Sequence, residues 1–191
     1  PDIEALTAAI SPRCAAVIVN SPNNPSGAVY TEESLRALTS LLRRKSYEYG
    51  KTIYLISDEP YRELVYDGAT VPYVPSLYDD TIVCYSYSKS LSLPGERIGY
   101  VMVSPRTRGC DAICDAVAGA ARRAGYVCAP SFMQRVLTET LGIYSDLSVY
   151  DENRRVLLEA LTSYGYTVTP PHGAFYLFVK SPEPDAHAFS E

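Results

Sequence analysis

Residues 81–103 read TIVCYSYSKSLSLPGERIGYVMV, and this stretch predicts how the last two strands of the sheet pair. It holds two apolar runs, at 81–88 and 98–103, rich in the β-branched and aromatic residues that strands favour. The residues between the runs are too few for a helical crossover, which parallel strands require. We therefore expect the second strand to return antiparallel to the first.

Two further apolar runs lie upstream, AAVIV at 15–19 and TIYLIS at 52–57. The first ends in the turn-forming cluster NSPNNPSG. Between the runs, Thr31 precedes leucines spaced as in an amphipathic helix with a hydroxyl cap, expected to extend to about Tyr49. These leucines are Leu35, Leu38, Leu41 and Leu42. Strand, helix and strand in succession predict an α/β fold whose sheet is mixed, mostly parallel and flanked by helices.

The second half of the chain is typical of helices followed by a small α+β unit. An Ala-rich helix is predicted over 107–125, another from Pro130, and a long one over 146–164 that Gly165 ends. Period-two character in YTVTPPHGAFYLFVK, at 166–180, then predicts two short strands. We place a domain boundary near 144, with 1–143 as part of a large cofactor-binding domain and 144–191 as the beginning of a small C-terminal domain.

The ends of the chain suggest part of a longer protein. The first residue is Pro1, and the final SPEPDAHAFSE has the pattern of an opening helix. No basic leader precedes an apolar stretch, and no run of about 18 apolar residues occurs. We expect neither a signal peptide nor a membrane span, and a cytoplasmic location.

Composition narrows the classes of function. The 191 residues include 17 Lys and Arg against 22 Asp and Glu, a net charge of −5, so no overall basic field attracts nucleic acid. Five cysteines without a C-x-x-C pair predict reduced thiols rather than disulfides. With two histidines in the chain, a zinc site is not expected.

Polar residues follow three of the predicted strands, at 20–27, 58–61 and 86–89. Ligands of open α/β sheets bind beyond the carboxyl ends of the strands, so these segments are expected to face one crevice. Lys89 is the one lysine of four that directly follows a strand. In an apolar surround its amine could have a lowered pKa and form a Schiff base with an aldehyde. Arg97 could hold an anionic group.

The segments NSPNNPSG (20–27), SDEPYREL (57–64) and SYSKSLSLPGERIGY (86–100) together resemble fold type I pyridoxal-phosphate enzymes. In order and spacing they are similar to the class I and II aminotransferases related to aspartate aminotransferase. The resemblance implies pyridoxal 5′-phosphate as cofactor and a ping-pong Schiff-base mechanism. It also implies an amino acid and a 2-oxo acid as substrates, and a homodimer in the full-length protein.

The same resemblance implies a role for individual residues. Lys89 matches the lysine that binds the cofactor and then moves the substrate proton, and Asp58 matches the aspartate that pairs with the pyridine nitrogen. Asn24 and Tyr61 match the two side chains that bond the phenolic oxygen of the ring. Taken one at a time, these residues also have ordinary structural interpretations. Asp58 could be a helix cap, Asn24 a turn residue and Lys89 a solvated surface charge.

Ser86, Ser88 and Arg97 resemble part of the cup that holds the cofactor phosphate. The family's N-terminal phosphate loop and the C-terminal arginine that binds the substrate carboxylate have no counterpart in these residues. We therefore expect this chain alone not to transaminate.

Two other functions stay open. Carbon–sulfur β-lyases and aminocyclopropane-carboxylate synthases have similar motifs, and Ser26 stands at a position where threonine is common in the aminotransferases. A non-catalytic binding module on the same fold is the second alternative.

Overall fold

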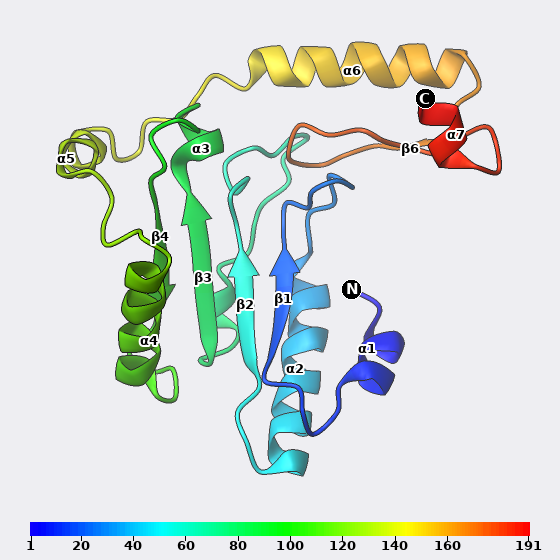
Figure 1. The fold of residues 1–191 in the computed structure, drawn as a ribbon. Coiled ribbons are helices and arrows are strands. Elements are labelled where there is room, and N and C mark those ends of the chain that lie inside the picture. The colour runs from blue at the N-terminus through cyan, green and yellow to red at the C-terminus, as the bar shows by residue number, and fades with distance from the viewer.

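The computed structural model describes residues 1–191, and its centre is a four-stranded sheet. The strands are β1 (Ala16–Asn20), β2 (Tyr54–Asp58), β3 (Thr81–Ser86) and β4 (Gly99–Val103), in that order across the sheet. β1, β2 and β3 run parallel, and β4 pairs antiparallel with β3. The α/β class and the mixed, mostly parallel sheet are therefore confirmed (Figure 1).

The third strand is shorter than its apolar run predicts. It ends at Ser86, and the next residues form the helical turn α3 (Tyr87–Ser90). The hydroxyl oxygen of Ser86 accepts a hydrogen bond from the Ser88 backbone N–H, which caps this turn. The expectation that 87 and 88 are strand residues was wrong, because a local cap overrides their alternating pattern.

The principal core lies between the sheet and the helices α1 (Ile3–Ala9) and α2 (Glu32–Tyr49). Thr31 caps α2 by accepting from the Ser34 N–H, as its sequence position predicts. The helix ends at Gly50, whose φ of 63° suits glycine. Leu38, Leu42, Ile53 and Leu55 are fully buried here, which anchors α2 against β2.

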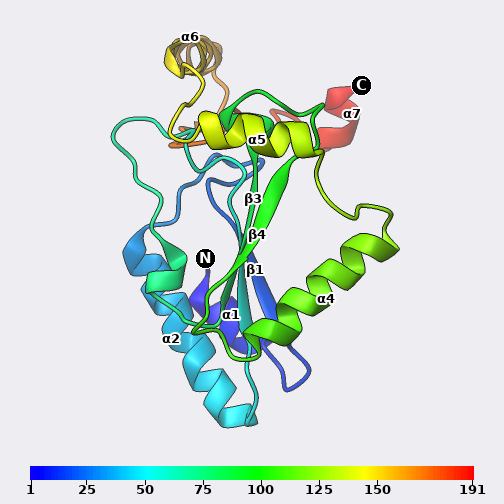
Figure 2. The same ribbon diagram turned by 90° about the vertical axis from the view of Figure 1, so that its left-hand side faces the viewer.

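The chain after β4 is largely helical. It comprises α4 (Cys110–Arg123), α5 (Ser131–Glu139), α6 (Ser148–Ser163), the antiparallel pair β5 (Val168–Thr169) and β6 (Phe178–Val179), and α7 (Ala186–Ser190). Figure 2 shows α4 on the side of the sheet opposite α2. The predicted helices and the strand pair are all present, whereas α1, α3 and the short 3-10 helix η1 (Val74–Ser76) were not predicted. No helix has the length and apolar character that crossing a membrane requires.

The loop between β5 and β6 lies against the carboxyl ends of the large sheet's strands. The N–H groups of His172 and Gly173 both donate to the Gly27 carbonyl at 3.0 Å, and Ala174 N–H donates to the Leu64 carbonyl at 2.9 Å. Gly27 has a φ of 68°, and a Cβ there would lie 2.2 Å from the Pro171 Cβ. Glycine at this position therefore permits the close approach of the loop. The boundary near 144 stays a prediction.

Candidate active site

The carboxyl ends of β1 and β2 place Asp58 beside Asn20. The two residues are opposite each other in the parallel register, and Asn20 Nδ2 donates to Asp58 Oδ2 at 3.0 Å. Partial burial raises the pKa of the Asp58 carboxyl, and the Asn20 hydrogen bond opposes that rise. The sequence places Asn20 in a polar segment after a strand but assigns it no role. Its position as the last residue of β1 is the signal that could have identified it.

Asn24 and Tyr61 meet through a third residue, Tyr176. The Tyr61 and Tyr176 hydroxyl oxygens are 2.7 Å apart, and Asn24 Nδ2 donates to Tyr176 Oη at 3.3 Å. Tyr61 is 5% exposed. Burial raises the pKa of Tyr61 well above its usual range, so its hydroxyl keeps its proton at neutral pH. Tyr176 lies more than a hundred residues along the chain, and no local pattern distinguishes it from the other tyrosines.

Lys89 lies on α3, partly buried beside an aromatic cluster. Its Nζ is 5.2 Å from the centre of the Phe175 ring, within the range of a cation–π contact. Phe175 stacks on Tyr150 with centroids 5.8 Å apart, and its ring meets Tyr61 edge-on at 5.4 Å. The amine therefore faces the Phe175 ring, which the loop between β5 and β6 contributes and which Tyr150 and Tyr61 flank. Sequence reasoning missed Phe175 and Tyr150.

The predicted anion-binding residues separate into two groups. Ser86 Oγ donates to Ser88 Oγ at 2.8 Å, so the two hydroxyls are together at the end of β3. Arg97 is exposed, has a φ of 51°, and donates from Nη1 to the carbonyl of Pro94 at 2.8 Å. Arg97 forms no hydrogen bond with either serine in the structure.

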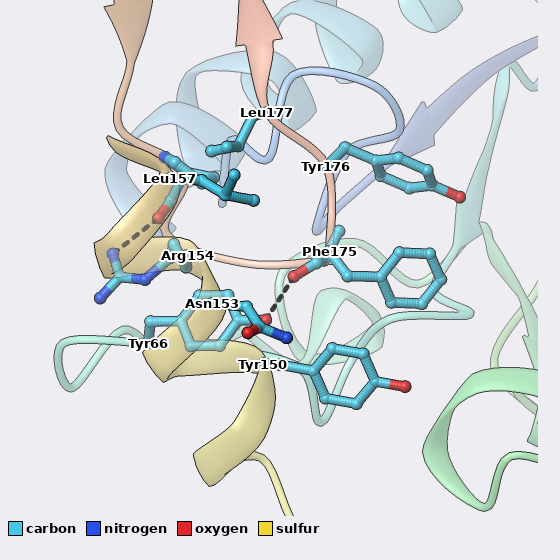
Figure 3. Close-up of a pocket in the computed structure, with 10 residues that line it drawn as sticks. Tyr66, Tyr150, Asn153, Arg154, Leu157, Phe175, Tyr176 and Leu177 are labelled. Atoms are coloured by element: carbon cyan, nitrogen blue, oxygen red, sulfur yellow. Dashed lines mark hydrogen bonds between the residues drawn. The ribbon is translucent and has the colours of Figure 1, made fainter. Parts of the chain in front are cut away.

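A cavity of about 250 Å³ lies next to this cluster, between α6 and the segment 171–177. Figure 3 shows the rings of Tyr150, Phe175 and Tyr176 along one side and Leu157 and Leu177 along the other. The Tyr66 hydroxyl donates to the Ala174 carbonyl at 2.7 Å beneath them. The cavity is thus mainly apolar and aromatic, and it adjoins the ring that Lys89 contacts.

Comparison with known proteins identifies the family. Residues 1–191 match the family "Aminotransferase class I and II" over their whole length. A probable aspartate/prephenate aminotransferase of Thermus aquaticus is 33% identical over 187 residues, which cover 94% of this chain and 45% of the relative. An aspartate aminotransferase of Thermotoga maritima is 30% identical over 184 residues, again 45% of its length. The chain spans about half the length of these curated relatives.

Solved structures agree with the sequence matches. A crystal structure of an aminotransferase from Eubacterium rectale has a TM-score of 0.95 and 53% identity, and the match covers 98% of this chain and 47% of that one. An aspartate aminotransferase variant from Thermus thermophilus has a TM-score of 0.78 and 32% identity, covering 97% of this chain and 50% of the other. With its whole length matched and its sheet shared with these enzymes, the chain belongs to the class I and II aminotransferases.

Proposed function

We propose that the protein containing this chain is a pyridoxal-phosphate-dependent aminotransferase that moves an amino group from an amino acid to a 2-oxo acid. The observation that carries the proposal is the placement of Lys89. It lies on α3, which directly follows β3, is partly buried beside Phe175, and is at the strand-end edge of the sheet where Asp58 also lies. Family membership and the resemblance to aspartate aminotransferases support this proposal.

The residues at this edge fit the chemical groups of the cofactor. The cofactor, when bound, supplies an aldehyde and a ring that accepts electrons from the substrate's α-carbon. A partly buried carboxylate, Asp58, suits the ring nitrogen, because an opposite charge nearby favours the protonated nitrogen. Lys89 supplies the amine for the aldehyde.

Two donors suit the ring oxygen. Tyr61 retains its proton and Asn24 has an amide N–H₂, so both can donate to an anionic oxygen. We assign the hydroxyls of Ser86 and Ser88 and the guanidinium of Arg97 to the phosphate, since hydroxyl donors and a permanent positive charge suit a dianion. Arg97 would exchange its Pro94 acceptor for the phosphate.

Lys89 has a second role in this proposal. Once a substrate amine replaces it at the cofactor, its free amine would take the proton from the substrate's α-carbon, acting as general base. The Phe175 ring, 5.2 Å from Nζ, forms one wall beside this amine.

The wider assembly is also part of the proposal. We infer a homodimer, a cytoplasmic location, and a large domain over 1–143 followed by the beginning of a small domain over 144–191. Cross-linking and sedimentation of the full-length protein would test the dimer.

The test is covalent labelling of the full-length protein. It is mixed with pyridoxal phosphate, reduced with borohydride and digested, and the labelled peptide is identified by mass. We expect the label on Lys89 and its loss in Lys89→Ala, whereas Lys51→Ala, a control at a lysine that precedes β2, keeps it. A wild-type protein without label on Lys89 would contradict the proposal and favour a non-catalytic binding module.

The products formed from test substrates distinguish transamination from β-elimination. Amino-acid exchange between 2-oxo acids without release of ammonia supports an aminotransferase. Formation of pyruvate and ammonia from cystathionine would instead identify a β-lyase.

A further inference from the structure

The Tyr176 hydroxyl stands between the two residues assigned above to the cofactor's ring oxygen. It is 2.7 Å from Tyr61 Oη and 3.3 Å from Asn24 Nδ2. Asn24 and Tyr61 follow different strands of the large sheet, whereas Tyr176 comes from the segment between β5 and β6. One hydroxyl therefore joins three separate parts of the chain at a single point.

The chemistry of Asn24, Tyr176 and Tyr61 favours one arrangement of donors and acceptors among the three side chains. The Asn24 amide nitrogen only donates, so Tyr176 Oη accepts from it. That bond polarises the Tyr176 O–H and makes it the better donor to Tyr61 Oη. Tyr61 then accepts from Tyr176, and its own proton remains free to point to a ligand.

The backbone around Tyr176 is held firmly. Ala174 N–H donates to the Leu64 carbonyl at 2.9 Å, and the Tyr66 hydroxyl donates to the Ala174 carbonyl at 2.7 Å. The Tyr61 and Tyr176 rings pack edge-on, with centroids 5.7 Å apart. Gly173 has no room for a side chain, since a Cβ there would lie 2.7 Å from Pro22 Cβ. Tyr176 thus approaches Tyr61 from a fixed position.

We propose that Tyr176 is a positioning residue for the cofactor's ring oxygen: it orients the Tyr61 hydroxyl and the Asn24 amide so that the Tyr61 proton points at that oxygen. The inference rests on the proposed function and adds a residue that the sequence motifs do not contain. Tyr176 acts through Tyr61 and Asn24, and so links the position of the loop between β5 and β6 to the electronic state of the cofactor.

The test uses the full-length protein loaded with pyridoxal phosphate and compares it with Tyr176→Phe. The readout is the pH midpoint at which the absorption spectrum of the bound cofactor changes, because the nitrogen that joins it to Lys89 loses its proton there. Loss of that proton leaves more negative charge on the ring oxygen, which Tyr61 stabilises by donating. Weaker donation in Tyr176→Phe is expected to raise the midpoint by roughly 0.3–1 unit, a two- to tenfold change in the proton dissociation constant.

Two further variants show whether Tyr176 acts through Tyr61. In Tyr61→Phe the added change Tyr176→Phe should shift the midpoint by less than half of what it does alone, since the pair is coupled. Tyr54→Phe is the matched control: it removes a hydroxyl at the start of β2 that donates to the Arg108 carbonyl, at the other end of the strand from the site. Its midpoint should equal that of the wild type, and circular dichroism checks that all variants fold.

Each contrary outcome identifies what fails. An unchanged midpoint in loaded Tyr176→Phe, or additive shifts in the double variant, would overturn the positioning role alone. Tighter cofactor binding by Tyr176→Phe would also overturn it, because the tyrosine would then compete for the position of the ring oxygen. A wild-type protein that takes up no cofactor would overturn the proposed function and this inference together.

Discussion

Arg154 on α6 donates to both carboxylate oxygens of Asp67, at 2.8 and 2.9 Å, across 87 residues of sequence. The guanidinium also donates to Asp151 and to the Pro171 carbonyl, and it lies over the Tyr66 ring at 4.7 Å. Only 8% of its side chain is exposed. This one side chain therefore joins α6, the segment after β2 and the loop that carries the aromatic cluster.

Replacing Arg154 with methionine should destabilise the protein by about 2–4 kcal/mol, since it leaves the buried Pro171 carbonyl and the Asp67 carboxylate without their donor. Urea unfolding of the full-length protein measures the change. Arg155→Met is the control, because the Arg155 side chain is 70% exposed and its pair with Asp151 should contribute less than about 1 kcal/mol. Equal effects of the two substitutions would contradict the role assigned to Arg154.

The same pair predicts a pH dependence of stability. Hydrogen bonds from Arg154 lower the pKa of the Asp67 carboxyl in the folded protein. The stabilisation is therefore present above the unfolded pKa of roughly 4 and is lost as the pH falls through the lowered folded value. The Tm of the wild type should exceed that of Asp67→Asn at pH 7, and the difference should narrow below about pH 4. A Tm difference that stays constant down to pH 2 would contradict a stabilising ion pair between Arg154 and Asp67.

Two glycines with similar backbone angles test the docking of the loop between β5 and β6. Gly27 and Gly68 have φ values of 68° and 72°, but only at Gly27 would a Cβ meet neighbouring atoms, the nearest at 2.2 Å. Gly68→Ala should cost about 1 kcal/mol from backbone strain alone, and Gly27→Ala about 2–4 kcal/mol because the loop must also move. Thermal unfolding compares them. Similar losses of stability in the two variants would mean that the loop between β5 and β6 can move away from Gly27 at little energetic cost.

Asn20 should control the ionisation of Asp58. Asn20→Ala removes the hydrogen bond that opposes the effect of burial, so the pKa of Asp58 should rise further. In the proposed enzyme the acidic limb of the kcat/KM profile should then move to higher pH. Ser57→Ala is the control, because the Ser57 hydroxyl bonds to Glu59 and its side chain points to the other face of β2. If the acidic limb of the kcat/KM profile does not move in Asn20→Ala, the ionisation of Asp58 does not control the reaction.

Local patterns in the sequence determined most of the fold. The strands, the capped helix α2 and the antiparallel return of β4 follow from residue spacing, loop length and capping chemistry, which act over a few residues. Parallel strands also bring their carboxyl ends to one edge, so the placement of Asp58 and Lys89 at that edge was predictable before any contact was known.

The contacts between side chains far apart in the sequence came from the three-dimensional arrangement of the elements. The contact of Tyr176 with Tyr61 spans 115 residues, and the approach of Phe175 to Lys89 depends on the same loop. That loop reaches the sheet because Gly27 and Gly173 leave room for backbone hydrogen bonds there. Such contacts depend on the summed path of many elements rather than on a local period. The sequence could therefore indicate an edge of the sheet as the site but not the third residue that joins Asn24 to Tyr61.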